Sequence, residues 1–227
     1  MRLGVSNLGN GTARQVRGDL MHLMCLTDML CTQESLDRHD EIDAACHASG
    51  WARYYAGTGR NVIMWDKRVP VHRHDLVQLS PRTGTGNPPG PRDTAGPDVV
   101  NAKDMPLVRV QGFGWVGGAH LPASQWWPPR RRLALDNTRD MADWSLGRYH
   151  LAIGADWNCK PTSGVLKPLR KAGLVSSQDF KRLGTHHGRP IDAFMYKGLI
   201  CLGSETVETT SDHDAYIVEL ERKERLR

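Results

Sequence analysis

Short apolar runs separated by turn residues recur along the whole sequence, and they predict a protein rich in β-strands. The first run alternates apolar and polar positions, whereas the run around Leu30 is continuously apolar, as expected for a buried strand. The predicted strands cover residues 3–8, 28–33, 51–55, 61–66, 107–110, 116–121, 149–154, 191–196, 199–202 and 216–220.

Four helices are predicted between some of these strands, from apolar residues at helical spacing and from residues that typically begin or end helices. They cover residues 12–24, 38–49, 131–146 and 165–172. Thr12 is suited to cap the first helix, and Gly50 is suited to end the second. Pro128 and Pro129 precede the third helix, and Gly173 closes the fourth. Strands dominate, with helices between some of them, which indicates a layered α/β or α+β fold.

The length of 227 residues fits one domain over residues 1–227, and 24% charged with 39% hydrophobic residues is an ordinary globular balance. Residues 80–105 differ, because they hold five prolines and four glycines with few apolar side chains. We predict a long mobile loop there. It is either a tolerated insertion, which we favour, or a flap on the substrate side.

The net charge and the cysteine content limit which kind of partner and which cellular compartment the sequence favours. A formal net charge of +5 suits a polyanionic partner, although basic surfaces also aid solubility. Five cysteines, with no pair at C-x-x-C spacing, disfavour a disulfide framework and a structural zinc site. The first residues show no signal-peptide pattern and no apolar run is long enough to span a membrane. We therefore expect a cytoplasmic protein with no membrane partner.

Polar residues of catalytic type stand where five of the predicted strands begin or end. Four strands reach Asn7, Glu34, His120 and Asp156, and the last strand begins just after Asp212-His213. Isolated carboxylates beside buried strands are costly unless they are paired or bound to metal. Carboxylate and amide oxygens suit a hard cation such as Mg²⁺ or Mn²⁺, and the histidines suit acid–base work. If these strand ends share one sheet edge, they form one pocket.

The same residues carry a family likeness, because the chain resembles the endonuclease/exonuclease/phosphatase superfamily, which has the DNase I-like fold. The matching pieces occur in the family's order over nearly the whole chain: Ser6-Asn7, Gln33-Glu34, Gly118-Ala119-His120, Gly154-Ala155-Asp156-Trp157-Asn158, Arg189-Pro190-Ile191-Asp192 and Ser211-Asp212-His213.

The sequence also departs from the family pattern. The usual Gly-Asp-Phe-Asn is altered by Ala155 before Asp156 and by Trp157 in place of the phenylalanine. Gly9 stands where some nucleases of the family carry a second acid. The chain is also short for the family, which implies reduced substrate-gripping loops.

The resemblance implies an α+β fold, a four-layered α/β/β/α sandwich in which two packed, mainly antiparallel sheets are flanked by helices. It further implies a metal site at Glu34, supported by Asn7 and Asp212, that takes Mg²⁺ or Mn²⁺. The implied catalytic residues are Asp156 to orient or deprotonate water, Asn158 to hold water or a phosphate oxygen, His213 to contact the phosphoryl oxygens, Asp192 to fix the His213 tautomer, and His120 to bind phosphate or aid the leaving group.

The most basic and aromatic stretch is Trp126-Trp127-Pro128-Pro129-Arg130-Arg131-Arg132. Its arginines are candidates for phosphate contacts and its tryptophans for base stacking. Alternatively the tryptophans anchor the helix start while the arginines are solvated. We interpret His186-His187 and His72-Arg73-His74 as surface or loop histidines, because neither group fits a known ligand spacing.

These observations favour a monomeric, divalent-metal-dependent phosphodiesterase acting on nucleic acid, most of all a DNA endonuclease or exonuclease. A phosphomonoesterase, such as a lipid- or inositol-phosphate phosphatase of the same superfamily, is one alternative. A non-catalytic nucleic-acid-binding module is the other. A P-loop nucleotide triphosphatase is disfavoured, because the sequence has no Gly-x-x-x-x-Gly-Lys-Ser/Thr loop.

Overall fold

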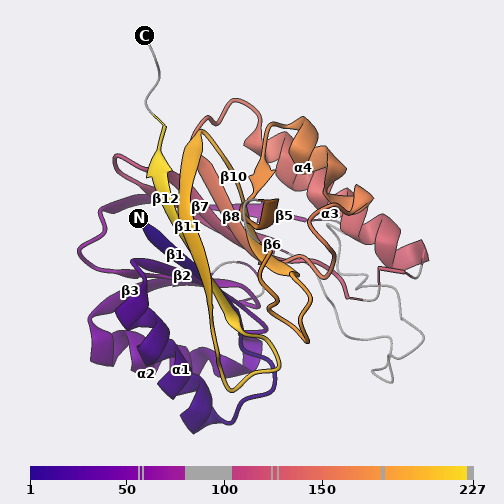
Figure 1. Ribbon diagram of the computed structural model, residues 1–227. Helices are drawn as coiled ribbons and strands as arrows, with labels where there is room; N and C mark the ends of the chain where they lie inside the picture. The colour runs from indigo at the N-terminus through magenta and orange to yellow at the C-terminus, as the bar shows by residue number, and fades with distance from the viewer. Residues whose placement is uncertain are drawn as a thin grey trace.

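A computed structural model describes residues 1–55, 57, 59–79, 104–123, 125–126, 128–179 and 182–223. These residues form two six-stranded sheets that pack face to face, with helices covering both outer faces (Figure 1). The predicted four-layered α/β/β/α sandwich is confirmed. Each sheet has one parallel strand pair and four antiparallel pairs, so the sheets are mainly antiparallel, as predicted.

The first sheet contains strands from both ends of the described chain. Its strand order is β11 (Leu199–Val207), β12 (Ala215–Arg222), β1 (Arg2–Asn7), β2 (Met29–Gln33), β4 (Val62–Asp66) and β3 (Trp51–Tyr55). Strand β1 lies inside the sheet, parallel to β2 and antiparallel to β12. The ends of β1 and β2 therefore lie side by side at one rim.

The second sheet repeats this arrangement around a parallel pair, β7 and β8. Its strand order is β5 (Val71–Gln78), β6 (Asp104–Val110), β7 (Gly114–His120), β8 (Leu151–Asp156), β10 (Asp192–Lys197) and β9 (Val175–Ser176). Registration places His120 opposite Asp156, and Asp156 opposite Asp192. Three candidate catalytic residues thus form one row across three neighbouring strands.

The helices cover the outer faces of the sheets. Helices α1 (Ala13–Leu26) and α2 (His39–Ser49), with the short η1 (Leu36–Arg38), pack on the first sheet; α3 (Pro128–Ser145), α4 (Lys167–Lys171), η2 (Gly164–Leu166) and η3 (Ser177–Asp179) lie with the second. Thr12 caps α1 through a capping box with Gln15, and Gly50 ends α2 in the left-handed conformation, both as predicted. No described helix is long and apolar enough to cross a bilayer.

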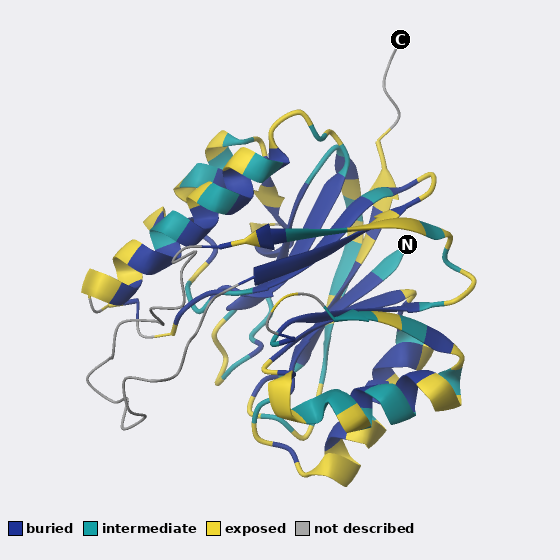
Figure 2. Cartoon of the chain, turned by 180° about the vertical axis from the view of Figure 1, so that it is seen from behind, coloured by how far each residue is buried: buried dark blue, intermediate teal, exposed yellow. Residues whose placement is uncertain are grey.

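Buried apolar side chains form three clusters, one between the sheets and one under each helix layer. Figure 2 colours the buried residues of the chain dark blue. Phe194 and Tyr216 are fully buried between the sheets. Within the second sheet, Gly154 on β8 lies directly opposite Phe194 on β10, and a Cβ at position 154 would lie 2.6 Å from Phe194 Cε1. Glycine is therefore required at this position for packing.

The structure differs from the sequence prediction at β5 and in its neighbourhood. Strand β5 was not predicted, because its polar run from His72 to Asp75 lies at the sheet edge and is largely exposed. Of the loop predicted over 80–105, residues 80–103 lie outside the described residues, whereas Asp104 and Met105 belong to β6. Histidines 72 and 74 are exposed as predicted, but on a strand.

Candidate active site

The ends of the two parallel strand pairs bring most of the predicted site residues to one rim of the sandwich. Asn7 ends β1 and Glu34 follows β2. His120 and Asp156 end β7 and β8, and Asp192 begins the antiparallel neighbour β10. Residues from both sheets therefore line a single cleft of about 530 Å³. The sequence analysis expected one pocket if the strand ends shared one sheet edge, and in the structure the pocket instead forms between the rims of two sheets.

Asn7 joins the two sheets at the floor of the cleft. Its Nδ2 donates to Glu34 Oε1 and to Asp156 Oδ2, each at 3.3 Å, and its Oδ1 accepts from the Gly9 backbone at 3.0 Å. Glu34 has a positive φ of 56°, which a residue with a Cβ rarely adopts. This backbone turn at the end of β2 coincides with a half-exposed side chain in the cleft, and such strain is concentrated at functional sites.

Asp156 is a buried carboxyl at the centre of the site. Burial and the charge of Asp192 raise the pKa of Asp156 to about 7, against smaller opposing effects of His213 and of hydrogen bonds from Asn158 and Asn7. The backbone N–H of Asn158 donates to Asp156 Oδ1 at 2.8 Å, which leaves Oδ2 facing the cleft residues. A carboxyl with a pKa near neutrality is suited to accept a proton from water.

His213 and Asp192 form a buried pair beside Asp156. His213 Nδ1 donates to Asp192 Oδ2 at 2.9 Å, and His213 Nε2 lies 3.9 Å from Asp156 Oδ2. Burial by itself lowers the pKa of His213, but the hydrogen bond and charge of Asp192, followed by the Asp156 charge, outweigh it and raise the pKa to about 9. His213 is thus a cation at neutral pH with Nε2 directed toward the site.

His120 and Asn158 complete the row on the second sheet. His120 Nε2 lies 3.5 Å from Asp156 Oδ2, and Asn158 Nδ2 donates to His120 Nε2 at 3.2 Å and to the Leu121 carbonyl at 3.0 Å. Asn158 also has a positive φ, 49°, a conformation that asparagine tolerates well. The turn after β8 therefore fixes both the backbone and the side chain of Asn158 against the cleft.

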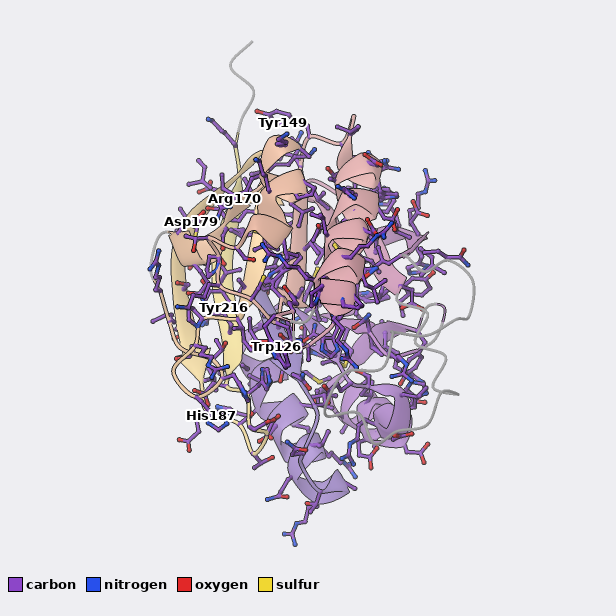
Figure 3. All side chains as sticks on the ribbon, turned by 90° about the vertical axis from the view of Figure 1, so that its right-hand side faces the viewer. Trp126, Tyr149, Arg170, Asp179, His187 and Tyr216 are labelled. Carbon is purple, nitrogen blue, oxygen red and sulfur yellow. The ribbon has the colours of Figure 1, made fainter. Side chains whose placement is uncertain are left out.

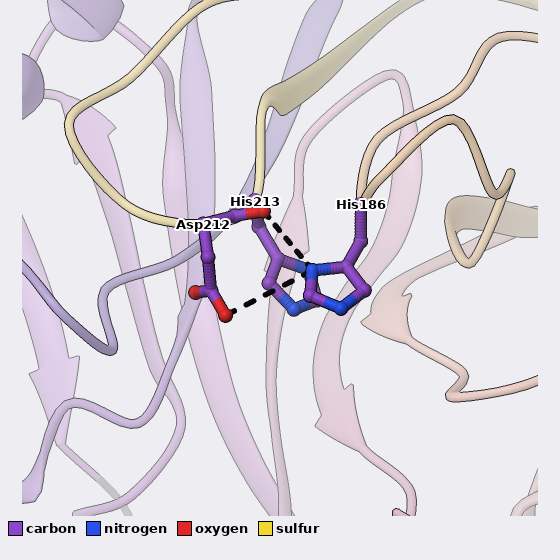
Figure 4. Close-up of side chains that lie close together, drawn as sticks. All are labelled: His186, Asp212 and His213. Atoms are coloured by element: carbon purple, nitrogen blue, oxygen red, sulfur yellow. Dashed lines mark hydrogen bonds and ion pairs between the residues drawn. The ribbon is translucent and has the colours of Figure 1, made fainter.

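His186 joins the site, although the sequence analysis placed it among surface or loop histidines. Its ring stacks on His213 with centroids 4.3 Å apart, and its Nδ1 donates to the Asp212 carbonyl at 3.0 Å (Figure 4). The Asp212 carboxylate lies 3.9 Å from the same nitrogen. No sequence spacing signals this contact, because it depends on an isolated bridge between residues 186 and 213.

Three arginines that line the cleft were not all anticipated. Arg130, predicted to bind nucleic acid, is 8% exposed, and burial lowers the pKa of its guanidinium. Arg38 and Arg60 also line the cleft, and Arg38 donates to the carbonyls of Gly9 and Gly11. The cleft therefore combines carboxylates on its floor with guanidinium groups around it, and the latter suit an anionic substrate.

The remaining residues of the basic stretch lie in different surroundings. Trp126, 70% exposed and labelled in Figure 3, lines with Arg131 a second cavity of about 500 Å³. The two cavities share Asn158 and His186, so they adjoin. Arg132 is exposed on α3 and lines neither cavity, and the side chain of Trp127 lies outside the described residues.

The donor set fits a hard divalent cation. Glu34, Asp156, Asp192 and Asp212 bring four carboxyl groups to the site, and the raised pKa of Asp156 reflects the burial and crowding of negative charge. One oxygen of the buried Asp192, Oδ1, has no hydrogen-bond partner among the described residues. A position-9 side chain would crowd the site, because a Cβ on Gly9 would lie 2.8 Å from Glu34 Oε2.

No known family model matches the sequence, and no curated protein matches it. An endonuclease/exonuclease/phosphatase from Bacteroides vulgatus is 13% identical, with a TM-score of 0.69 over 97% of this chain and 98% of that one. The chain has the endonuclease/exonuclease/phosphatase fold. The fold implied by the sequence resemblance is thereby confirmed.

Two other solved structures of this fold are about as similar to this chain. D. rerio TDP2, solved with a single-strand DNA product, has a TM-score of 0.72 and 9% identity, covering 97% of this chain and 98% of that one. A mannosyl-6-phosphatase from Bacteroides thetaiotaomicron has a TM-score of 0.68 and 16% identity, covering 97% and 99%. These likenesses establish the endonuclease/exonuclease/phosphatase architecture of the chain and leave its substrate to the site itself.

The departure from the family pattern at Trp157 is accommodated within this fold. Its side chain is 1% exposed in the layer under α3, and its Nε1 donates to the Ala193 carbonyl at 3.1 Å. The larger ring thus packs away from the cleft, while Asp156 and Asn158 on either side of it face the cleft.

Proposed function

We propose that the chain is a divalent-metal-dependent phosphodiesterase that hydrolyses nucleic acid, with DNA favoured. The observation that carries this proposal is the buried contact series from Asp192 through His213 to Asp156, which opens into a cleft beside Glu34. It combines a cation, a carboxyl with a pKa about 7 and a separate carboxylate within one site. Hydrolysis of a phosphate ester needs this combination.

The proposed reaction is an in-line displacement at phosphorus. A water molecule held by Asp156 and Asn158 attacks phosphorus, and Asp156 accepts the proton that water loses. The new bond joins the water oxygen to phosphorus, and the ester P–O bond breaks on the opposite side. His213, kept charged by Asp192, donates a hydrogen bond from Nε2 to a phosphoryl oxygen, and His120 binds the phosphate or assists the departing oxygen.

Mg²⁺ or Mn²⁺ fits the carboxyl groups described above, with Glu34 as the main ligand and Asn7 and Asp212 in support. When bound, the ion would neutralise the charge that develops on the phosphoryl and leaving oxygens. Asn7 would hold Glu34 and Asp156 at a fixed spacing, since its Nδ2 contacts both carboxyl groups.

Nucleic acid is favoured as substrate by the cations around the cleft. Arg38, Arg60 and Arg130 lie around the carboxyl groups, and Arg131 with Trp126 lines the adjoining cavity. Guanidinium groups bind backbone phosphates and an exposed indole can stack on a base. The net charge of +5 and the structural likeness to TDP2, solved with single-strand DNA, agree with this assignment.

Cleavage of supercoiled plasmid and of a 5′-labelled oligonucleotide, with Mg²⁺, Mn²⁺ or EDTA, tests the proposal. We expect metal-dependent cleavage that falls on the order of 100-fold or more in Glu34→Gln and in His213→Ala. Glu221→Gln and His47→Ala, which change exposed residues outside the cleft, are the matched controls. Cleavage that persists in EDTA, or that is equal in all four variants, would contradict the proposal.

A phosphomonoesterase is the second candidate, and the similarity to a mannosyl-6-phosphatase is the observation in its favour. Release of inorganic phosphate from small monoesters, without any cleavage of DNA or RNA, would select it. Metal-independent binding of nucleic acid without hydrolysis of any ester would instead select a non-catalytic module.

A further inference from the structure

A compact group of arginines and tryptophans lies at the end of the second sheet away from the catalytic cleft. It comprises Arg73 on β5, Arg109 on β6, Trp115 on β7, Trp144 near the end of α3, and Arg148 just after α3; we call it the distal arginine cluster. Trp115 is the second residue of β7 and His120 is the last, which separates the cluster from the cleft by about 17 Å along the strand. None of its members lines the cleft.

The guanidinium groups gather on the tryptophan rings. Those of Arg73, Arg109 and Arg148 lie 5.6, 6.0 and 5.9 Å from the centroid of Trp115, and that of Arg148 is also 3.8 Å from the centroid of Trp144. The two indoles meet edge to face at 5.5 Å. Attraction to the ring faces holds each guanidinium in place. Arg148 Nη1 also donates to the Trp144 carbonyl, which fixes this guanidinium further and leaves its other donors for an anion.

The strand pairing within this cluster places like charges next to each other, which by itself does not favour folding. Arg73 pairs directly with Arg109, and Arg109 pairs directly with Trp115, so two arginines stand opposite each other on one face of neighbouring antiparallel strands. Like charges at directly opposed positions destabilise a sheet. The cation–π contacts with Trp115 offset part of this cost, and the positive charge of the pair stays available to an anion.

Acidic side chains do not compensate the cluster. Within the described part of the chain, none of the three arginines forms an ion pair with a carboxylate. Asp75, two residues from Arg73, instead accepts a hydrogen bond from the Leu76 backbone. Lys197 is close enough to the cluster to sense it, because the Arg148 charge, after burial, lowers the pKa of its ammonium group.

We propose that the distal arginine cluster is a second binding site for nucleic acid, which contacts backbone phosphates outside the catalytic cleft. Three guanidinium groups around one ring match several phosphates better than a single small anion, and nucleic acid presents phosphates at close, regular spacing. Helix α3 links the two sites, since Arg130 at its start lines the cleft and Trp144 near its end lies in the cluster. Tyr149, which follows Arg148 of the cluster, is labelled near the top of Figure 3. Trp126, which lines the cavity beside the cleft, lies well below it.

This inference rests on the proposed nucleic-acid substrate, and it is tested by binding without turnover. A fluorescent DNA duplex of about 30 base pairs, ~100 Å long, is titrated in EDTA at several salt concentrations. Replacement of all three cluster arginines by glutamine is expected to weaken binding about tenfold or more. The slope of log affinity against log salt should become shallower by about 0.9 for each lost phosphate contact.

A matched triple variant changes the same formal charge elsewhere. Arg2, Arg68 and Arg170 are each ion-paired, with Glu205, Asp66 and Asp179 respectively, and replacing them by glutamine should leave the slope unchanged. If the cluster variant does not fold, the Arg73→Gln/Arg109→Gln pair replaces it, because both side chains are exposed. Equal slopes and affinities in the cluster and control variants would overturn the inference.

Turnover separates this inference from the proposed function. Hydrolysis of bis-para-nitrophenyl phosphate, which is too small to reach both sites, should be the same in the cluster variant and the unmodified protein. If the unmodified protein cleaves DNA while the cluster variant binds it normally, only the second site is refuted. If no metal supports cleavage of DNA yet binding depends on the cluster, only the proposed phosphodiesterase activity is refuted.

Discussion

Replacing Asp192 by asparagine is expected to lower the pKa of His213 by between about 1 and 3, toward its ordinary value near 6.5. In the unmodified protein the pKa is about 9, although burial alone would lower it, because Asp192 supplies a hydrogen bond and a negative charge at 2.9 Å. A rise from 6.5 to 9 corresponds to about 3 kcal/mol in favour of the charged ring. An amide oxygen at position 192 can keep the hydrogen bond but not the charge.

The measurement is an NMR titration of the His213 ring, performed in EDTA so that no metal competes for the site. Asp212→Asn is the matched control, because the Asp212 charge also raises the pKa of His213 but is the smallest of the contributing causes. We expect a clearly smaller decrease in this control. A His213 pKa that stays within about 0.5 of 9 in Asp192→Asn would refute the assignment of Asp192 as the group that keeps the ring charged.

The same pair makes stability depend on pH with a defined sign. Because the folded-state pKa of His213 lies above its unfolded value, the stabilisation is complete below about pH 6.5 and is lost as the pH rises through about 9. The unfolding free energy of the unmodified protein, relative to Asp192→Asn, should therefore fall by up to about 3 kcal/mol between pH 6 and pH 10. Urea titrations at the two pH values measure it, and a difference that grows with pH would contradict the reasoning.

Three further substitutions test the metal site, the packing and the cleft. Glu34→Gln should raise the Mg²⁺ concentration needed for half-maximal cleavage and cut the maximal rate on the order of 100-fold; unchanged metal dependence would exclude Glu34 as a ligand. Gly154→Ala should lower the unfolding free energy by about 1–3 kcal/mol in urea, because its Cβ would meet Phe194 at 2.6 Å, whereas Gly18→Ala in the open surface of α1 should be neutral or stabilising. Arg130→Gln should make the salt dependence of DNA binding shallower by about 0.9, and an unchanged slope would remove Arg130 from the phosphate contacts.

Much of the fold could be predicted from the sequence because its strands are buried on a regular pattern. Strand β3 has the predicted bounds, β2 and β4 begin one residue later than predicted, and β1 begins and ends one residue earlier than predicted. Strand β5 escaped prediction because an exposed edge strand with a polar run lacks the apolar signal that marks a buried one. Its position was decided by pairing with β6, which no local pattern encodes.

The candidate site shows the same division between local and tertiary information. Asn7, Glu34 and Asp156 were found because each stands at the end of an apolar run, where the chain must turn at the rim of a sheet. His186 was not found, because its place beside His213 depends on a bridge between two loops. The roles of all these residues stay predictions until the variants above are assayed.

The arrangement of the first sheet bears on the order in which the protein is made. Strand β12 lies between β11 and β1, and His213 stands two residues before it, so a pairing partner of β1 and the candidate catalytic histidine are both synthesised after Glu34 and Asp156. A ribosome-bound chain that has exposed Glu34 and Asp156 still lacks the imidazolium and the strand that holds it in place. The proposed hydrolytic site therefore stays incomplete until His213 and β12 have been synthesised and have paired with β1.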